Sequence, residues 1–522
     1  MEPLPQYRRF STARFFAIVM TLSLLGLITP RPALSEDARL NLLIIQTDEH
    51  NFRTLGCYRE TMSPEQALIW GADAIVETPA IDSIAQRGAV CTSFYATSPV
   101  CTPSRASFFT GKYPQNTGSP QNDMPLNGNM VTFAQVLSNQ GYRTGYAGKW
   151  HLDGSGKPQW APKRQFGFDD NRFMFNRGHW KKFELTAAGP RVGARKNNKP
   201  NYNLNGADET TFSTDWLTDR AIDFINVESD QPFCYHLSLP DPHGPNTVRP
   251  PYDTMFSNTI IRPPLTFSKT TENPKWAPAA GKNGAGSFRA DMMAKYFGMV
   301  RCIDDNVARL LAVLKQRGQL DKTVIVFTSD HGDLCYEHGR LNKGIPYEAS
   351  AKIPFIMAAP GKTLKSNVVN EALGTVDFLP TILEVLDANT PDGVEGRSFL
   401  SLLNRRPEDA QLRFTEGTGS GDWGRTTILR NAGTKASWIA AVQDRFKLVL
   451  STSDRPWLFD LDVDPDELRN FIDEPGYAAG AKKLAGAIRD YAAEFGEPHL
   501  QHPQLRRQLD QLLPEALSLG AP

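Results

Sequence analysis

The sequence predicts an α/β fold in which a large, mostly parallel central sheet is flanked by helices and followed by a smaller C-terminal α+β subdomain. Three observations predict this fold. Short apolar runs rich in β-branched residues alternate with longer segments of helical periodicity. A chain of 522 residues is long enough for one large core and an appended unit. After about residue 405, short strand-like segments replace the alternating pattern and precede a single helix.

The first of these observations depends on a small number of elements. The apolar runs that we predict as buried strands are Leu40–Gln46, Phe233–Leu239, Thr323–Thr328 and Ile353–Ala358. Met292 to Arg317 has apolar residues at helical spacing and stops before Gly318, so we predict a long helix there. Residues 155–210 and 244–290 are rich in Gly, Pro and Asn, and we predict two long excursions from the sheet.

The C-terminal part has its own short elements. Arg445–Leu450 and Trp457–Leu461 are predicted strands, and a helix is expected near residues 478–494. We therefore expect a catalytic domain over residues 36–405, a C-terminal α+β subdomain over residues 406–500 and a tail over residues 501–522.

The composition narrows the classes of function. Hydrophobic residues make up 40% of the chain and charged residues 22%, as in a soluble globular protein. Lys and Arg together number 57, as do Asp and Glu, so no net charge attracts nucleic acid or a membrane surface. The six cysteines show no CxxC pairing or regular spacing, which argues against a zinc site or a disulfide scaffold.

The N-terminus has the pattern of an export signal. Arg8, Arg9 and Arg14 precede the apolar run Phe15–Ile28, and small residues follow at Ala33-Leu34-Ser35. This order is typical of a secretory signal peptide, and the run is shorter than the roughly 20 residues that span a bilayer. We expect a signal peptide over residues 1–35, a periplasmic or secreted protein, and no stable membrane insertion after cleavage. An uncleaved anchor is the alternative.

Acids and imidazoles follow three of the predicted strands directly. Asp48-Glu49 comes after the first strand, Asp330-His331 after the third, and His243 after the second. Ligands of open α/β sheets bind beyond the carboxyl ends of the strands, so these side chains should meet at one edge. Converging carboxylates repel each other unless a cation lies between them.

A divalent metal held by Asp48, Glu49, Asp330 and His331 resolves this repulsion. A ligand set made mostly of oxygen atoms favours Ca²⁺ over zinc, and Mg²⁺ is the other candidate. The alternative is that each acid only caps a helix or a turn.

Cys101 lies at a predicted helix start. Thr102 is expected as the N-cap, Pro103 fits the first helical position, and residues 104–110 can form a short helix. A helix N-terminus favours an anion, and Arg105 lies one turn further on. By these arguments alone, Cys101 is either a nucleophilic thiolate or an inert buried thiol.

These residues carry a family resemblance. Cys101-Thr102-Pro103-Ser104-Arg105, followed by Thr110-Gly111, resembles the signature of the type I sulfatases, which belong to the alkaline phosphatase superfamily. Further motifs appear in the family's order: Asp48-Glu49, Gly148-Lys149-Trp150-His151, His243 between two prolines, Asp330-His331-Gly332, Lys343, and Trp457-Leu458-Phe459-Asp460-Leu461. Glu49 departs from the family, which more usually has Asp or Gln at that position. The resemblance covers roughly residues 40–470.

The resemblance implies a modified nucleophile. A separate maturation enzyme, which generates formylglycine, would oxidise Cys101, and the hydrated aldehyde would replace the thiol. The hydrate would bind the metal, so that residue 101 becomes one of the metal's ligands. The same hydrate would attack the sulfur atom of the sulfate ester. Its second hydroxyl would then expel sulfate and regenerate the aldehyde.

The resemblance also implies roles for the remaining motifs. Arg105 would hold the hydrate together with the metal and stabilise negative charge. Lys149 would bind sulfate, and His151 would contact the hydrate and assist elimination. His243 and Lys343 would contact the sulfate and the bridging oxygen, one of them as the general acid.

The substrate is expected to be a sulfated poly- or oligosaccharide, because export favours an extracellular target. Aromatic and cationic residues that would suit such a chain populate the first excursion: Trp160, Trp180, Lys181, Lys182, Arg191, Arg195, Lys196 and Lys199. They could equally be ordinary surface residues.

Two other functions compete with this interpretation. A phosphonate monoester hydrolase or phosphodiesterase of the same superfamily would share the site. A carbohydrate-binding protein without activity could keep the fold, but the intact set of Cys101, Arg105 and the metal residues argues against it.

Overall fold

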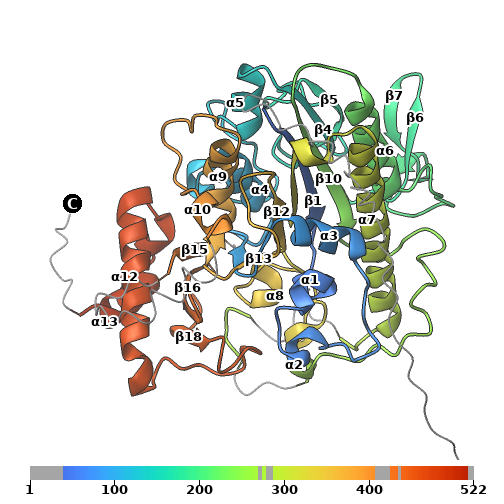
Figure 1. The fold of residues 1–522 in the computed structure, drawn as a ribbon. Helices are drawn as coiled ribbons and strands as arrows, with labels where there is room; N and C mark the ends of the chain where they lie inside the picture. Colours follow the sequence, from blue (N-terminus) through green and yellow to red (C-terminus); the bar gives the residue numbers. More distant parts are fainter. Residues whose placement is uncertain (1–38, 269–272, 278–285, 406–423, 433–436, 515–522) are drawn as a thin grey trace, which may run out of the picture. The chain divides into compact units, whose positions relative to one another are not determined.

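The computed structural model describes residues 39–268, 273–277, 286–405, 424–432 and 437–514. These residues belong to one compact unit that begins at Arg39 (Figure 1). The predicted signal peptide, residues 1–35, lies outside the described residues. No helix within the described ranges has the length and apolar character needed to cross a membrane.

An eight-stranded mixed sheet forms the centre of this unit (Figure 1). Its order is β13 (Asn367–Val369), β2 (Ala89–Cys91), β12 (Phe355–Ala358), β11 (Thr323–Ser329), β1 (Asn41–Asp48), β10 (Phe233–Pro242), β4 (Arg143–Lys149) and β5 (Asp170–Phe175). The strands from β11 to β5 are parallel, and β12 runs antiparallel to both of its neighbours. The predicted fold class is confirmed, and the four predicted strands correspond to β1, β10, β11 and β12.

Helices cover both faces of the sheet. One face carries α3 (Pro79–Arg87), α6 (Ser213–Asn226) and α7 (Ala290–Gln316), and the other carries α4 (Cys101–Thr110), α5 (Phe133–Asn139) and α9 (Phe378–Val385). In β1, Leu43 and Ile45 enter the first core while Leu42 and Ile44 enter the second. A strand buried on both faces needs apolar residues at every position, which explains the continuous apolar runs of the sequence.

Helix α7 matches the predicted long helix to within two residues at either end. The predicted start of α4 is wrong. Val100 is the N-cap, and the helix begins at Cys101 itself. The Thr102 hydroxyl instead donates to the His151 carbonyl at 2.9 Å, so a contact between distant segments has replaced the expected local cap.

The C-terminal subdomain is built on an antiparallel sheet of four strands: β15 (Thr426–Asn431), β16 (Trp438–Gln443), β17 (Phe446–Ser451) and β18 (Trp457–Asp460). One face packs on α12 (Ala478–Phe495) and α13 (Pro503–Leu512), and the other packs on residues of the main unit such as Tyr95 and Tyr347. The segment that we expected as a tail from residue 501 contains α13, whose Leu505 is buried in this core.

The first predicted excursion contains the edge strand β5 and then two small antiparallel pairs. These are β6 (Phe183–Thr186) with β7 (Gly189–Val192), and β8 (Arg195–Lys196) with β9 (Lys199–Pro200). The expectation of an irregular excursion therefore missed β5, whose alternating Asn171, Phe173 and Phe175 carry a strand pattern.

Candidate active site

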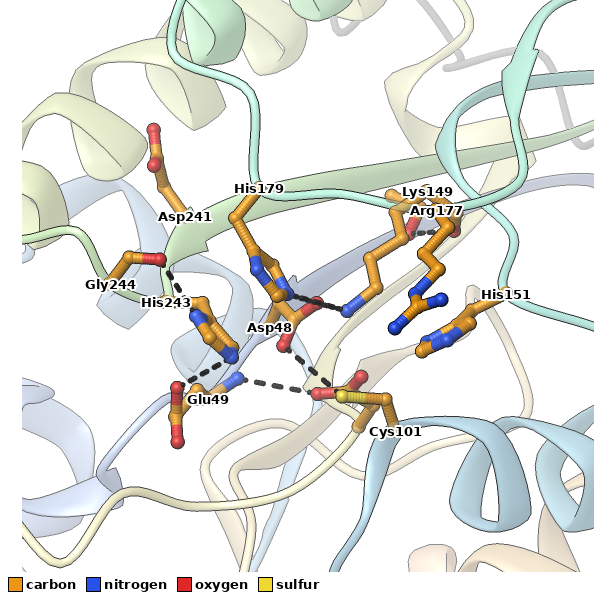
Figure 2. A network of polar contacts seen from close by, with 12 residues as sticks. Asp48, Glu49, Cys101, Lys149, His151, Arg177, His179, Asp241, His243 and Gly244 are labelled. Carbon is orange, nitrogen blue, oxygen red and sulfur yellow. Dashed lines mark hydrogen bonds and ion pairs between the residues drawn. The ribbon is translucent and has the colours of Figure 1, made fainter. Parts of the chain in front are cut away.

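The predicted site residues converge at the carboxyl edge of the parallel strands (Figure 2). Asp48 ends β1, Lys149 ends β4, and His243 follows β10. Asp330 and His331 follow β11 directly. Adjacent parallel strands all present their carboxyl ends to the same edge, so topology alone brings residues from distant segments together.

A buried cluster can hold a metal ion at this edge. One side-chain atom from each of Asp48, Cys101, Asp330 and His331 lies within 4.8 Å of all the others. The Nε2 atom of His331 is 3.1 Å from Cys101 Sγ, 3.4 Å from Asp330 Oδ1 and 3.6 Å from Asp48 Oδ1. Its Nδ1 donates to the Gly332 carbonyl, so Nε2 is the atom free to bind a metal. Two buried carboxylates and one imidazole therefore fit a divalent cation.

Arg105 is a buried cation that lies next to the carboxylates of Asp330 and Asp48. Its Nε donates to Asp330 Oδ2 at 2.9 Å, and its Nη1 donates to the Lys149 carbonyl and to Ser238 Oγ. Nη2 lies 3.6 Å from Asp48 Oδ2 and has no hydrogen-bond partner among the described residues. Arg105 is fully buried, so its charge is held in a fixed place beside the cluster.

Lys149 places a second cation beside the cluster. Its Nζ lies 2.5 Å from Asp48 Oδ2 and 2.9 Å from Nε2 of His179 (Figure 2). Burial raises the pKa of the Cys101 thiol, but the charges of Lys149 and Lys343 outweigh it and leave that pKa well below its usual range. The surroundings of residue 101 therefore favour a negative charge on its side chain.

His151 has a carboxylate partner that we did not predict. Its Nε2 lies 2.8 Å from Asp123 Oδ1, and Arg177 pairs with the other oxygen of Asp123 at 2.9 Å. Because a carboxylate can only accept, Nε2 carries a proton, and in the neutral ring Nδ1 is therefore left as an acceptor. Nδ1 is buried and has no partner among the described residues, and the ring lies beside Cys101 (Figure 2).

Glu49, His243 and Lys343 form a charged triad on the opposite side of the site. The Glu49 carboxylate lies 2.9 Å from His243 Nε2 and 3.0 Å from Lys343 Nζ, and these two nitrogens are 2.7 Å apart. Burial opposes ionisation of Glu49, but His243 and Lys343 hold its pKa well below the usual range. Glu49 contacts the metal cluster through its backbone N–H, which donates to Asp330 Oδ1.

Strained backbone fixes two of these side chains. Glu49 has φ of 62° and His151 has φ of 60°, both in the left-handed region that residues other than glycine rarely adopt. Gly148, with φ of 111°, packs so closely on β10 that a Cβ atom would lie 1.8 Å from the Ser238 carbonyl oxygen. Such strain is stored at functional sites because it holds groups in place.

Some cations of the first excursion do not face a substrate. The Nζ atom of Lys181 is completely buried, 2.5 Å from Asp241 Oδ1 and 3.0 Å from the His243 carbonyl. The predicted role of Lys181 in contacting a sugar is therefore wrong. A buried lysine needs a carboxylate partner, and this pair supports the segment that carries His243.

Sequence reasoning missed Asp123 and Arg177 and gave His179 no definite role. Arg177 and His179 follow β5, at the same carboxyl edge as the predicted residues. The sequence does contain a pattern that indicates them. A strand predicted at Asp170–Phe175 places the polar residues that follow it at the carboxyl edge of the sheet. Asp123 lies in a loop without periodicity, and only its contact with His151 distinguishes it.

Two family models match the chain. The model described as Sulfatase matches residues 41–388, which includes every residue of the site. The model described as N-sulphoglucosamine sulphohydrolase, C-terminal, matches residues 336–494, which includes the C-terminal sheet.

Individual relatives cover nearly the whole chain. An N-acetylglucosamine-6-O-sulfatase of Bacteroides thetaiotaomicron is 26% identical over 92% of this chain and 91% of its own. A solved structure described as a complex with its substrate D-glucosamine-2-N,6-O-disulfate has a TM-score of 0.69 and 22% identity, covering 90% of this chain and 100% of that one. A phosphonate monoester hydrolase from Silicibacter pomeroyi has a TM-score of 0.65 and 22% identity, covering 88% and 97%.

Proposed function

The chain belongs to the sulfatase family, and on that basis we propose that it hydrolyses sulfate monoesters of a sulfated poly- or oligosaccharide. It is a sulfuric ester hydrolase by family. The observation that carries the proposal is the position of Cys101, which lies in the buried cluster with Asp48, Asp330 and His331 and close enough to Lys149 and Lys343 for their charges to lower its pKa. A tetrahedral anion attached at residue 101 would meet positive charge on two sides.

Asp48, Asp330, His331 and residue 101 would hold the divalent metal, which we propose to be Ca²⁺. When bound, the cation lowers the pKa of a hydroxyl on residue 101 and neutralises sulfate oxygens. Glu49 as a further ligand stays a prediction, because its carboxylate lies with His243 and Lys343 in the structure.

Cys101 is proposed to become formylglycine, which supplies two hydroxyl groups on one carbon in its hydrated form. The described contacts suit such a group. Nδ1 of His151 is held as a proton acceptor by Asp123, and it can remove the proton from a hydroxyl on residue 101. Lys149 and Arg105 stay charged beside it and can hold the sulfate oxygens.

One of the pair His243 and Lys343 is proposed to protonate the leaving alcohol as the general acid. Nδ1 of His243 donates to the Gly244 carbonyl at 2.9 Å, so Nε2 is the atom that can exchange a proton. That atom lies between the ammonium of Lys343 and the carboxylate of Glu49. It can therefore accept from one neighbour or donate to the other, as a general acid requires.

Two observations support a saccharide substrate and export of the protein. The named relative acts on N-acetylglucosamine sulfate, and the signal-like N-terminus favours an extracellular polymer over a cytosolic metabolite. We therefore propose a periplasmic or secreted enzyme that also depends on a maturation enzyme for formylglycine.

The test compares three substrate classes on one preparation. The protein is produced together with a formylglycine-generating enzyme, and the conversion of Cys101 is verified by peptide mass spectrometry. Release of sulfate or phosphonate is then measured on sulfated oligosaccharides, an aryl sulfate and an aryl phosphonate monoester, with Cys101→Ala as the control. We expect sulfate release that is absent in the control.

Two outcomes would contradict the proposal. Phosphonate cleavage with negligible sulfate release would move the chain to the phosphonate monoester hydrolases, whose fold it also shares. Equal turnover by Cys101→Ala would show that residue 101 takes no part in the reaction.

The metal is tested separately. Dialysis against a chelator should abolish sulfate release, and addition of Ca²⁺ or Mg²⁺ should restore it. The cation that restores activity identifies the natural one.

A further inference from the structure

A small open pocket of about 420 Å³ lies next to the candidate active site. Five residues line it: Lys157, Trp180, Pro200, Asn201 and Tyr202. All belong to the first long excursion, between β4 and α6. The pocket belongs neither to the metal cluster nor to the charged triad.

The side chain of His179 lies between the pocket and the proposed sulfate-binding residues Lys149 and His243. The ring of Tyr202 is 6.1 Å from the ring of His179, measured between centroids. His179 in turn contacts Lys149 Nζ at 2.9 Å and stacks on His243 with the ring centroids 3.4 Å apart. A molecule with its sulfate ester on Lys149 can therefore reach Tyr202 past the His179 ring.

One wall of the pocket is rigid and aromatic. Trp180 is 3% exposed, and its Nε1 donates to the Arg177 carbonyl at 3.0 Å. The ring of Tyr202 packs on it at 4.7 Å between centroids and is itself half-buried. Aromatic faces fixed in this way bind the apolar face of a sugar ring and lose little side-chain entropy in doing so.

The pocket also has a cation, Lys157, that pairs with no carboxylate of the described residues. Lys157 is exposed, and its Nζ lies 4.7 Å from the centroid of Tyr202 and 5.5 Å from that of Trp180. Within the described ranges, no carboxylate lies at ion-pair distance from it. Other cations of the same excursion do have such partners: Lys181 pairs with Asp241 and Arg191 with Glu184.

We propose that this pocket is a subsite for the sugar next to the sulfated one, and that Lys157 binds an anionic substituent on that sugar. The inference rests on the proposed sulfatase function. Tyr202, supported from behind by Trp180, would pack against the sugar ring, while the ammonium group would pair with a carboxylate or with a second sulfate. The volume is in the range of pockets that hold one small ligand. The preferred substrate is therefore a polyanionic saccharide in which adjacent units both carry charge.

Binding is measured first, because it does not depend on formylglycine. Isothermal titration with Cys101→Ala protein compares three matched disaccharides that carry the target sulfate and a neighbouring carboxylate, a neighbouring second sulfate, or no charge. We expect Lys157→Met to weaken binding of the charged ligands about tenfold and to remove the preference over the neutral one. Lys157→Arg should restore it, and Lys163→Met, an exposed lysine of the same excursion outside the pocket, should match the parent.

Kinetics with matured enzyme provides the second measurement. Lys157→Met and Tyr202→Leu should raise KM for the charged disaccharides about tenfold more than KM for an aryl sulfate, which does not reach the pocket. The titration also identifies the substituent that Lys157 binds. It is the carboxylate if Lys157→Met weakens binding of only the carboxylate ligand, and the second sulfate if it weakens binding of only the disulfated one.

Two results overturn the subsite, and they differ from failure of the proposed function. Unchanged affinity in Lys157→Met, or equal losses for charged and neutral ligands, would exclude it even if the enzyme hydrolyses sulfate esters. Absence of all sulfate release by matured enzyme would instead refute the proposed function, while the titration would still decide whether Lys157 recognises an anionic sugar.

Discussion

Single residues decide what the site can do, and Asp123 shows how. It touches neither the metal cluster nor Cys101, yet its carboxylate determines which nitrogen of His151 carries the proton. A histidine–carboxylate bond at 2.8 Å also lowers the pKa of Asp123, and burial only partly opposes it. Arg177 holds the second carboxylate oxygen and thereby fixes the orientation of the pair. Asp123 is thus a positioning residue that acts through His151.

We predict that Asp123→Asn lowers kcat by about tenfold or more and leaves KM for an aryl sulfate nearly unchanged. The amide can bond to His151 through either its oxygen or its nitrogen, so the ring no longer has one fixed tautomer. Steady-state kinetics on protein with equal formylglycine content measures the effect. Asp153→Asn, on the loop after His151, is the matched control. A rise in KM without a change in kcat would show that Asp123 contacts the substrate instead.

Secondary-structure elements set the positions of these residues. Strand β4 must approach β10 closely for Lys149 to reach Asp48, and Gly148 permits that approach because it has no Cβ atom. At the other side of the site, α8 (Glu348–Ala351) follows the loop that carries Lys343. Lys447 of β17 lies 2.8 Å from Glu348 and 2.6 Å from Glu467, and all three are buried. Each of these contacts leads to a prediction.

Gly148→Ala should destabilise the protein by about 3 kcal/mol or more, because the new methyl group would overlap the Ser238 carbonyl and the backbone is left-handed. Gly141→Ala is the matched control. Gly141 has φ of 82° but no heavy atom near its added Cβ, so it should lose only about 1 kcal/mol. Denaturant unfolding compares the two variants. Equal losses would mean that the conformation, and not the contact with β10, makes the glycine necessary.

The buried pair of acids predicts a pH dependence of stability. Burial raises the pKa of Glu467 from 4.5 to about 7, although Lys447 opposes this rise. Between pH 4.5 and 7 the folded protein therefore holds a proton that the unfolded chain releases. The free energy of unfolding falls as pH rises through this window, by about 3 kcal/mol at most from this group, and is level above it.

Glu467→Gln removes this titration, so the midpoint of thermal unfolding of the variant relative to the parent should rise from pH 5 to pH 8. The measurement is a set of melting curves at matched ionic strength, with the exposed Glu494→Gln as the control. A difference that stays constant with pH would show that Glu467 is ionised throughout this range.

At the scale of the whole molecule, the C-terminal sheet supports the loop of an active-site lysine. Asn431 of β15 donates to the Gly344 carbonyl at 2.7 Å, and Trp438 Nε1 of β16 donates to the same oxygen at 3.1 Å. Gly344 follows Lys343 directly in the chain. The subdomain is thus more than an appended unit, because two of its strands hold the backbone beside a residue of the charged triad.

Asn431→Asp tests this connection, since it places a carboxylate oxygen against the Gly344 carbonyl. We expect kcat to fall about tenfold and the free energy of unfolding to fall by about 1–2 kcal/mol. Activity assays and denaturant unfolding measure the two effects, with the exposed Asn404→Asp as the control. Full activity despite a loss of stability would mean that the position of Lys343 does not depend on the subdomain.

The fold class and most of the residues of the candidate site follow from patterns in the amino-acid sequence. Parallel strands share one carboxyl edge, so Asp48, His243 and Asp330 could be brought together without knowing any distance. The same logic would have reached Arg177 and His179 if β5 had been recognised.

The partners of these residues, by contrast, depend on the packing of distant segments. The Glu49 carboxylate lies with His243 and Lys343, Thr102 bonds to His151 instead of capping α4, and Lys181 is buried against Asp241. The physical reason is the same in each case. Strand periodicity and strand ends are local properties of the chain, whereas the partner of a buried charge depends on which distant loops pack around it, and loops carry no periodicity from which to predict this.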